Sequence, residues 1–238
     1  MRSIVGSLAV ISLGVLGCGH TNRLAEYPVV GSTMLFQSRA LPTAIDAEVW
    51  IAPPPTDTAT PRQVSWILEI ARIAGEVLTE VTAYRKLSEA IVPEELALAA
   101  GRGFQEAAVR WLRVTPVRSL EHDPAFLAET ILEKYRLTST PSGVYAQVQL
   151  RSRILHRETA RVVWEVHRNA SIPIQQTRGI AYVPGVATAT SAAHAARLLS
   201  LETEELRQLF NRAAQAAGEQ LGETLRKDVE KLPQKAAR

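Results

Sequence analysis

The chain contains a single cysteine, Cys18, and this limits how any fold of the chain can be stabilised. An intramolecular disulfide is excluded, so a hydrophobic core must hold the structure together. Cys18 follows a positively charged start at Arg2 and an apolar run over Ile4–Gly17, which is the layout of a secretory signal peptide. The run is shorter than the roughly 20 apolar residues that a spanning helix needs, so we expect cleavage.

The residues before Cys18 resemble the lipobox of bacterial lipoproteins, with Val15–Gly17 in the three positions that precede the cysteine. The resemblance implies that residues 1–17 are a signal peptide and that Cys18 is lipidated, with acyl chains such as palmitate. Two or three acyl chains hold a protein at a membrane far more firmly than one. Gly19 implies sorting to the outer membrane, facing the periplasm, if the host has two membranes. The alternative is an uncleaved anchor that buries the Cys18 thiol.

Composition and charge place the rest of the chain in the globular class. The 238 residues are 46% hydrophobic, and this length suits one domain. There are 27 Lys and Arg residues against 24 Asp and Glu, and this balance does not suggest nucleic acid as a partner. We expect a lipidated N-terminus and tether over residues 18–43, a single domain over 44–232 and a basic tail over 233–238.

The predicted tether has no sustained periodicity and contains Gly, Asn, Pro and Ser, which is typical of a linker. The run Ala44–Ile51 is rich in β-forming residues and stops at Pro53–Pro55, so it predicts a first strand. A loop over 56–61 is expected to follow.

Two helices are predicted next. Apolar residues recur at helical spacing over Arg62–Leu87, which predicts a well-buried helix. Its stripe consists of Val64, Leu68, Ala71, Ala74, Leu78 and Val81, widened by Ile67, Ile70 and Ile73. Residues 84–91 either complete this helix or form a short strand. Pro93–Val114 predicts a second helix, which Gly101 and Gly103 weaken in its middle.

An antiparallel meander is predicted in the second half of the chain. Phe126–Thr138 follows an Asp-Pro pair that suits a helix start, but its residues also alternate at strand spacing. We favour a strand, because Val144–Ile154 alternates between apolar and polar residues and Arg161–His167 returns beside it after a turn.

The last part of the chain predicts a loop and then a helix. Ser171–Ala195 contains Pro and Gly and then an Ala/Thr/Ser run, so we expect a long loop. From a Ser200 cap, Leu201–Leu232 shows the clearest amphipathic pattern in the chain. Its apolar side consists of Leu206, Phe210, Ala213, Ala217, Leu221, Leu225, Val229 and Leu232.

Together these elements predict an α+β fold with two layers. Two to three helices, including the long C-terminal helix, would cover one face of a mainly antiparallel sheet, built from the three-stranded meander and the N-terminal strand. The other face, with Gln147, Gln149, Arg151 and Arg153, would be open to water.

No pattern indicates a catalytic residue, a metal site or a cofactor. The histidines lack metal-ligand spacing. They are His20, His122, His156, His167 and His194. On one strand face, Glu129 and Glu133 would lie about 13 Å apart, beyond the roughly 10 Å of paired glycosidase carboxylates, so we interpret them as ordinary charges. The tryptophans fall in apolar patterns that predict core positions. They are Trp50, Trp66, Trp111 and Trp164.

Behind the lipobox, the order of elements resembles that of envelope accessory lipoproteins. These are the proteins similar to the N-terminal domain of the Tol-system β-propeller protein TolB, and the auxiliary lipoproteins of ABC-type transport. The meander over Leu132–Glu165 and the helix over Leu201–Leu232 carry this resemblance. It implies a non-enzymatic role in envelope assembly, secretion or transport, with membrane contact through acyl chains on Cys18 and with an envelope protein or a second copy as partner.

Three hypotheses on function are therefore left open. An adaptor would dock its partner through the open sheet face, an edge strand or the loop over Gly179–Ala195. A lipid-binding module would enclose an apolar groove between the sheet and the C-terminal helix. An envelope hydrolase would need a site built from residues such as Glu129, Glu133, His156 and His167.

Overall fold

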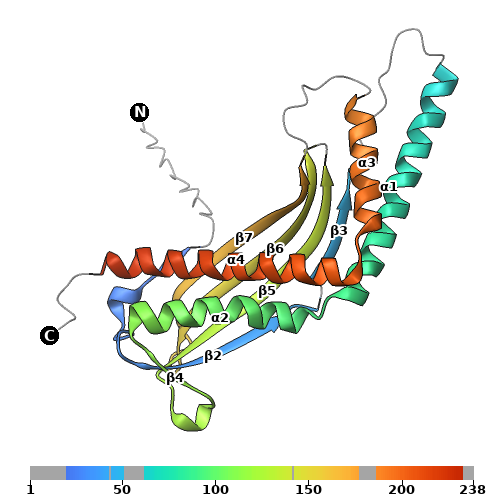
Figure 1. Cartoon of the computed structure of the whole chain (residues 1–238). Helices are drawn as coiled ribbons and strands as arrows, with labels where there is room; N and C mark the ends of the chain where they lie inside the picture. Colours follow the sequence, from blue (N-terminus) through green and yellow to red (C-terminus); the bar gives the residue numbers. More distant parts are fainter. Residues whose placement is uncertain (1–19, 43, 51–61, 141, 177–185, 233–238) are drawn as a thin grey trace, which may run out of the picture.

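Helices cover one face of a seven-stranded sheet, which confirms the predicted α+β fold (Figure 1). The structure is a computed structural model that describes residues 20–42, 44–50, 62–140, 142–176 and 186–232. The predicted loop over 56–61 and the tail over 233–238 lie outside these residues.

The sheet is mixed, and it is larger than the sequence predicts. Its strands are β1 (Thr21–Asn22), β2 (Thr33–Ala40), β3 (Ile45–Val49), β4 (Thr115–Val117), β5 (Phe126–Thr140), β6 (Gly143–His156) and β7 (Val162–Gln176). The order across the sheet is β1-β7-β6-β5-β2-β4, and β3 pairs with β5 off this path. The meander β5-β6-β7 is antiparallel as expected, whereas β2 and β3 run parallel to β5, and β4 runs parallel to β2. The sheet is therefore not a meander with one added strand.

Four α-helices are described. They are α1 (Arg62–Ala90), α2 (Pro93–Leu112), α3 (Val186–Ser200) and α4 (Thr203–Glu230). Short 3-10 turns lie at Leu24–Glu26 and Leu120–His122. Residues 84–90 therefore finish α1, and α2 begins at the predicted proline with acidic residues in its first turn.

The tether prediction for residues 18–43 is wrong over β1 and β2. β2 pairs with β5 from Met34 opposite Phe126 to Ala40 opposite Leu132, and the side chains of Met34 and Leu35 are buried. The strand is eight residues long, and in its second half only two polar side chains are exposed. The alternation between buried and exposed residues is therefore too short to be recognised in the sequence. Its burial depends on β5, almost a hundred residues away.

Two predictions about the last third of the chain are also wrong. The expected loop over Ser171–Ala195 is instead the end of β7, which continues to Gln176 opposite Gly143, and the start of α3 at Val186. Alanine has the highest helix propensity, so the Ala-rich run forms a helix. Ser200 does not cap α4, because the N-cap residue is Glu202 and the Ser200 hydroxyl donates to the Arg197 carbonyl.

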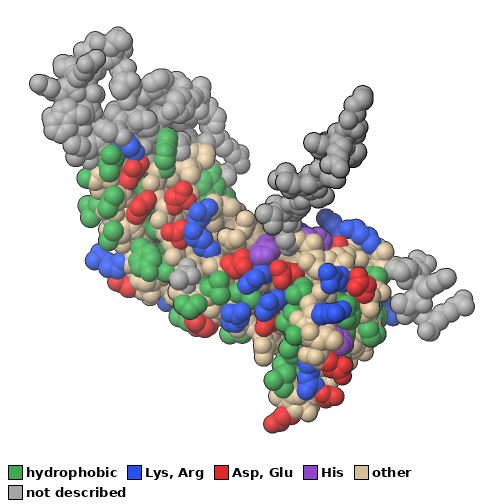
Figure 2. Space-filling model, turned by 180° about the vertical axis from the view of Figure 1, so that it is seen from behind, with side chains coloured by type: hydrophobic (Ala, Val, Ile, Leu, Met, Phe, Trp, Pro, Cys, Tyr) green, Lys and Arg blue, Asp and Glu red, His purple; other side chains and the backbone are tan. Residues whose placement is uncertain are grey.

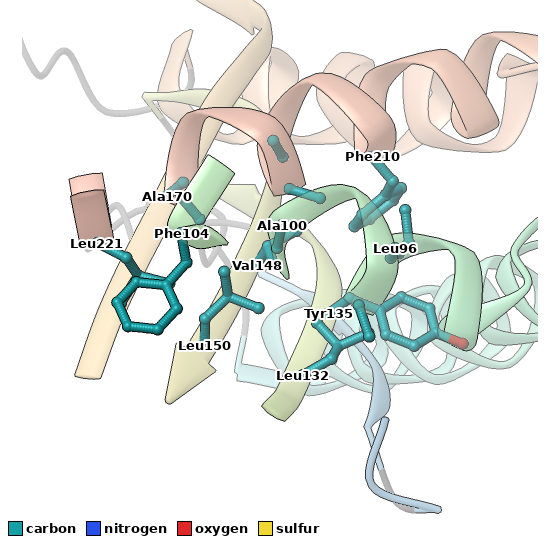
Figure 3. Packing of buried hydrophobic residues seen from close by; sticks show 14 of the residues in the cluster. Leu96, Ala100, Phe104, Leu132, Tyr135, Val148, Leu150, Ala170, Phe210 and Leu221 are labelled. Atoms are coloured by element: carbon teal, nitrogen blue, oxygen red, sulfur yellow. The ribbon is translucent and has the colours of Figure 1, made fainter. Parts of the chain in front are cut away.

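The core lies between the sheet and the pair α2 and α4. Figure 3 shows side chains of these two helices, among them Phe104, Phe210 and Leu221, packing against β5, β6 and β7. Glycines allow two close approaches. A Cβ on Gly218 of α4 would lie 2.5 Å from the carbonyl oxygen of Ala100 on α2, and one on Gly101 of α2 would lie 2.0 Å from Ser38 Oγ on β2. The glycines of α2 thus permit close packing and do not mark a weak point.

The tryptophan prediction is right for one residue. Trp164 on β7 is fully buried and stacks on Phe104 with ring centroids 5.3 Å apart. Trp50 and Trp111 are 39% and 38% exposed, so their predicted core positions are wrong. Trp111 packs under the guanidinium of Arg226, 6.0 Å from the ring centroid. The side chain of Trp66 lies outside the described residues.

Candidate functional site

The first described residue, His20, is fixed to the body of the domain. Its Nε2 lies 2.7 Å from Oδ2 of Asp228, near the end of α4. The same carboxylate oxygen accepts a hydrogen bond of 2.9 Å from the buried indole Nε1 of Trp164. Nζ of Lys231 lies 3.3 Å from Oδ1 of Asp228. We call these four residues the N-terminal clamp.

The clamp stabilises a buried negative charge. Asp228 is 2% exposed, and burial by itself raises the pKa of its carboxyl. The hydrogen bonds from Trp164, His20 and Lys231 and the electrostatic interaction with His20 together outweigh burial, so the pKa lies below its usual value. A buried carboxylate of this kind holds its donors in place, because losing one would leave a buried charge incompletely paired.

Cys18 lies outside the described residues, so its lipidation stays a prediction. The clamp nevertheless holds the chain two residues after it, at the sheet edge where β1 pairs with Glu165 and Trp164 of β7. The clamp was missed in the sequence, although one signal was present. Asp228 follows Leu225 by three residues, which is a stripe position on α4, and a charge in an apolar stripe needs a buried partner.

The face of the sheet turned away from α2 and α4 is open, and charges of both signs gather on it (Figure 2). Arg153 Nε lies 2.6 Å from Glu129 Oε2. Glu133 contacts Arg151 Nε at 3.1 Å through one oxygen and His167 Nδ1 at 3.1 Å through the other. These pairs link β5, β6 and β7 across the face, and we call them the charge ladder.

Glu129 and Glu133 are both paired within the charge ladder. Each glutamate lies in an ion pair with an arginine, and both are about four-fifths shielded from water. Ion pairs this near the surface contribute little stability, of the order of 1 kcal/mol or less each. They do hold the side chains of the open face in fixed positions, which suits recognition by a partner surface.

Beyond a β-bulge after Leu132, the same face becomes a shallow hollow of about 200 Å³. Its lining includes Gln147, Gln149, Asn169 and Ser171. Arg136 donates to Gln147 Oε1 at 2.6 Å and to Glu48 Oε2 at 2.8 Å, and Lys134 pairs with Asp46. Gln147, Gln149, Arg151 and Arg153 therefore all lie on the open face, as predicted.

The histidines are dispersed. His122 contacts Ser119, His156 contacts Thr159 and lies against Phe126, and His194 contacts the carbonyl of Thr140. His156 and His167 are not brought together, because His167 pairs with Glu133 and Glu165. Among the described residues no group of three or more His, Cys, Asp or Glu side chains could hold a metal ion. No described helix is long and apolar enough to cross a membrane.

The outer edge of β7 is protected against pairing with another strand. β1 covers only two residues of this edge. Further along, Arg168 Nη1 donates to the carbonyl of His167 at 2.8 Å, while its other nitrogens bind Thr224 Oγ1 on α4. Pro173 has no N–H to offer, and proline in a sheet is typical of such protected edges. This edge is a poor docking site for a partner strand.

The chain matches no family model and no curated protein. Among solved structures it is similar to the Xanthomonas campestris protein XCC0632 of the DUF330 family, at 13% identity and a TM-score of 0.37, over 89% of this chain and 97% of that one. It is similar to the PelC dodecamer from Paraburkholderia phytofirmans, at 12% identity and a TM-score of 0.32, over 76% and 95%.

The lipoprotein GNA1162 from Neisseria meningitidis is a further structural neighbour, at 6% identity and a TM-score of 0.25, over 71% of this chain and 99% of that one. The neighbours thus include a lipoprotein, and none of these three names states an enzymatic activity.

Proposed function

We propose that the protein is a lipoprotein of the cell envelope, anchored by acyl chains on Cys18, that acts as a non-enzymatic adaptor. The open face of the sheet, with its charge ladder and the adjoining hollow, docks an envelope protein. The observation that carries this proposal is that ion pairs order the part of the open sheet face formed by β5, β6 and β7, which no described helix covers. In a mixed sheet with helices on one side, an ordered polar face is a ready interaction surface.

The clamp supports the anchored part of the proposal. A lipid on Cys18 would begin two residues from His20, which Asp228 fixes at the C-terminal end of α4. The domain would then be held close to the membrane at that end, and not on a tether of some 25 residues. Outer-membrane sorting with the domain facing the periplasm follows from Gly19 if the host has two membranes.

The two other hypotheses have less support. A lipid-binding module needs an apolar space between sheet and helices, but Phe104, Trp164 and Phe210 fill that interior and are at most 1% exposed. The hollows of about 650 and 200 Å³ on the described residues lie on the outer surface. A hydrolase needs a free acid or base, whereas Glu129 and Glu133 are held by arginines.

A photo-crosslinking residue at Gln149, in the hollow of the open face, tests the docking surface in intact envelopes. We expect an adduct with another envelope protein. The same residue at Glu121, which is exposed in the turn after β4, is the matched control and should give none. When Arg151→Glu is combined with the photo-crosslinking residue at position 149, the adduct should be lost, because the substitution places two acids side by side in the charge ladder. Equal adducts from both positions, or none from Gln149, would refute docking on this face.

A further inference from the structure

The outward side of α1 is apolar and has no partner among the described residues. Ile73, Val77, Val81 and Tyr84 follow one another at helical spacing and are 47 to 63% exposed, and Leu78 beside them is 69% exposed. The predicted burial of this helix is therefore wrong on one side. Its opposite side, with Ala83 and Leu87, is fully buried. We call the five exposed residues the α1 stripe.

The α1 stripe is free of charge over three turns. The acids in this part of the helix point elsewhere: Glu76 pairs with Arg72, and Glu80 accepts a hydrogen bond from the backbone N–H of Val49. Single exposed apolar residues are ordinary, but a contiguous exposed stripe of large side chains marks an interaction site.

A groove runs along the outer seam of α2 and α4. Two hollows of about 650 and 240 Å³ share Gly103, Glu106 and Glu219, so they form one continuous groove. Its floor has almost no side chains, because it is formed by Gly103 and Gly222 together with Ala99 and Ala107. The glycines that let the two helices pack closely thus also leave room for a third element.

The groove is long enough to hold the α1 stripe. The stripe from Ile73 to Tyr84 spans eleven residue steps, about 17 Å at the helical rise, and the α2 wall of the groove, from Glu95 to Trp111, spans sixteen, about 24 Å. Leu98, at the groove edge, is 51% exposed and offers an apolar contact.

The charges at the margins are also complementary. Glu95, Arg102, Glu106 and Glu219 on the groove rim have no ion-pair partner among the described residues. The same holds for Arg85 and Glu89, which lie exposed just beyond the C-terminal end of the α1 stripe. Each surface therefore brings unpaired charges of both signs around an uncharged centre, as complementary interfaces do.

We propose that the α1 stripe of one copy docks into the α2–α4 groove of a second copy. A chain cannot fill its own groove in this way, because only two residues join α1 to α2 and α1 projects away from the α2–α4 pair (Figure 1). The two surfaces are different patches, so the contact is head-to-tail and repeats into a ring or an open chain. A lipid surface does not suit the stripe, since α1 lies at the far end of the molecule from the C-terminal end of α4, where the clamp lies.

Cysteine crosslinking between two separately purified chains tests this contact. Both chains carry Cys18→Ser, and one carries Val77→Cys while the other carries Ala99→Cys. With a short bis-maleimide, we expect a covalent dimer from the mixture and none from either chain alone. Replacing Val77→Cys by Thr82→Cys, on the flank of the same helix, should remove the product. No product from the mixture, or a dimer from Val77→Cys alone, would overturn the head-to-tail contact.

Light scattering provides the second readout, again in the Cys18→Ser background. We expect the parent to assemble beyond a dimer as its concentration rises. The double variant Val77→Glu/Val81→Glu should be a monomer. Its unfolding midpoint should be unchanged, because both valines are more than half exposed. Thr82→Glu should assemble like the parent. A monomeric parent, or assembly that survives the double charge, would refute the inference. Neither outcome bears on the Gln149 adduct with another protein, so this inference and the proposed function fail separately.

Discussion

Gly218→Val is expected to destabilise the fold by at least about 3 kcal/mol. A Cβ at this position would lie 2.5 Å from the carbonyl oxygen and 3.2 Å from the carbonyl carbon of Ala100, which are backbone atoms of α2. These atoms cannot move aside as a side chain can, so α2 and α4 would have to separate along the seam that carries the core. Urea unfolding of the Cys18→Ser protein measures the change.

Gln220→Val is the matched control for this substitution. It places the same side chain on a nearby, exposed position of α4 that lies outside the α2–α4 groove. Valine is a better helix former than glycine, so any loss at Gly218 comes from the contact and not from helix propensity. Equal stabilities of the two variants would show that α2 and α4 do not approach as closely as described.

Trp164→Ala should lower the free energy of unfolding by about 3 to 5 kcal/mol. The change removes a fully buried ring that stacks on Phe104, and it takes from Asp228 one donor that keeps its carboxylate ionised inside the protein. With Asp228 incompletely paired, His20 should also be held less firmly, so limited proteolysis should cut the N-terminal segment faster than in the parent.

Trp111→Ala is the identical change at a tryptophan that is 38% exposed. It loses only partial packing and one contact with Arg226, so its cost should be below about 1.5 kcal/mol. If both substitutions cost the same, Trp164 would not be the buried centre of the clamp.

Local patterns in the sequence were sufficient where an element is long and one-sided. The stripe of α4, from Leu206 to Leu225, is buried as expected, and β6 alternates between the core and the open face as predicted. The proline and acids of α2 specify its start. These features depend on neighbours three or four residues away along a helix, or two along a strand, and such spacings can be seen in a single sequence.

The remaining features depend on contacts between distant parts of the chain. β2 is recognisable only beside β5, and the hydrogen bond from His20 to Asp228 joins residues 208 positions apart. The α1 stripe shows a different limit of sequence reasoning. Its periodicity correctly indicates a surface that is suited to burial, but periodicity does not say whether the same chain or another molecule covers it. For this reason the sequence predicts a well-buried helix, whereas one side of α1 is exposed.

Intact mass together with membrane fractionation tests whether acyl chains on Cys18 anchor the protein. The wild-type chain is compared with Cys18→Ser after expression in a bacterial host. We predict that the wild type lacks residues 1–17, carries the mass of two or three acyl chains and sediments with membranes, whereas Cys18→Ser carries no acyl mass and leaves the membrane fraction. An unmodified wild-type chain that fractionates like Cys18→Ser would contradict lipid anchoring, and with it the role of the clamp in holding the domain at a membrane.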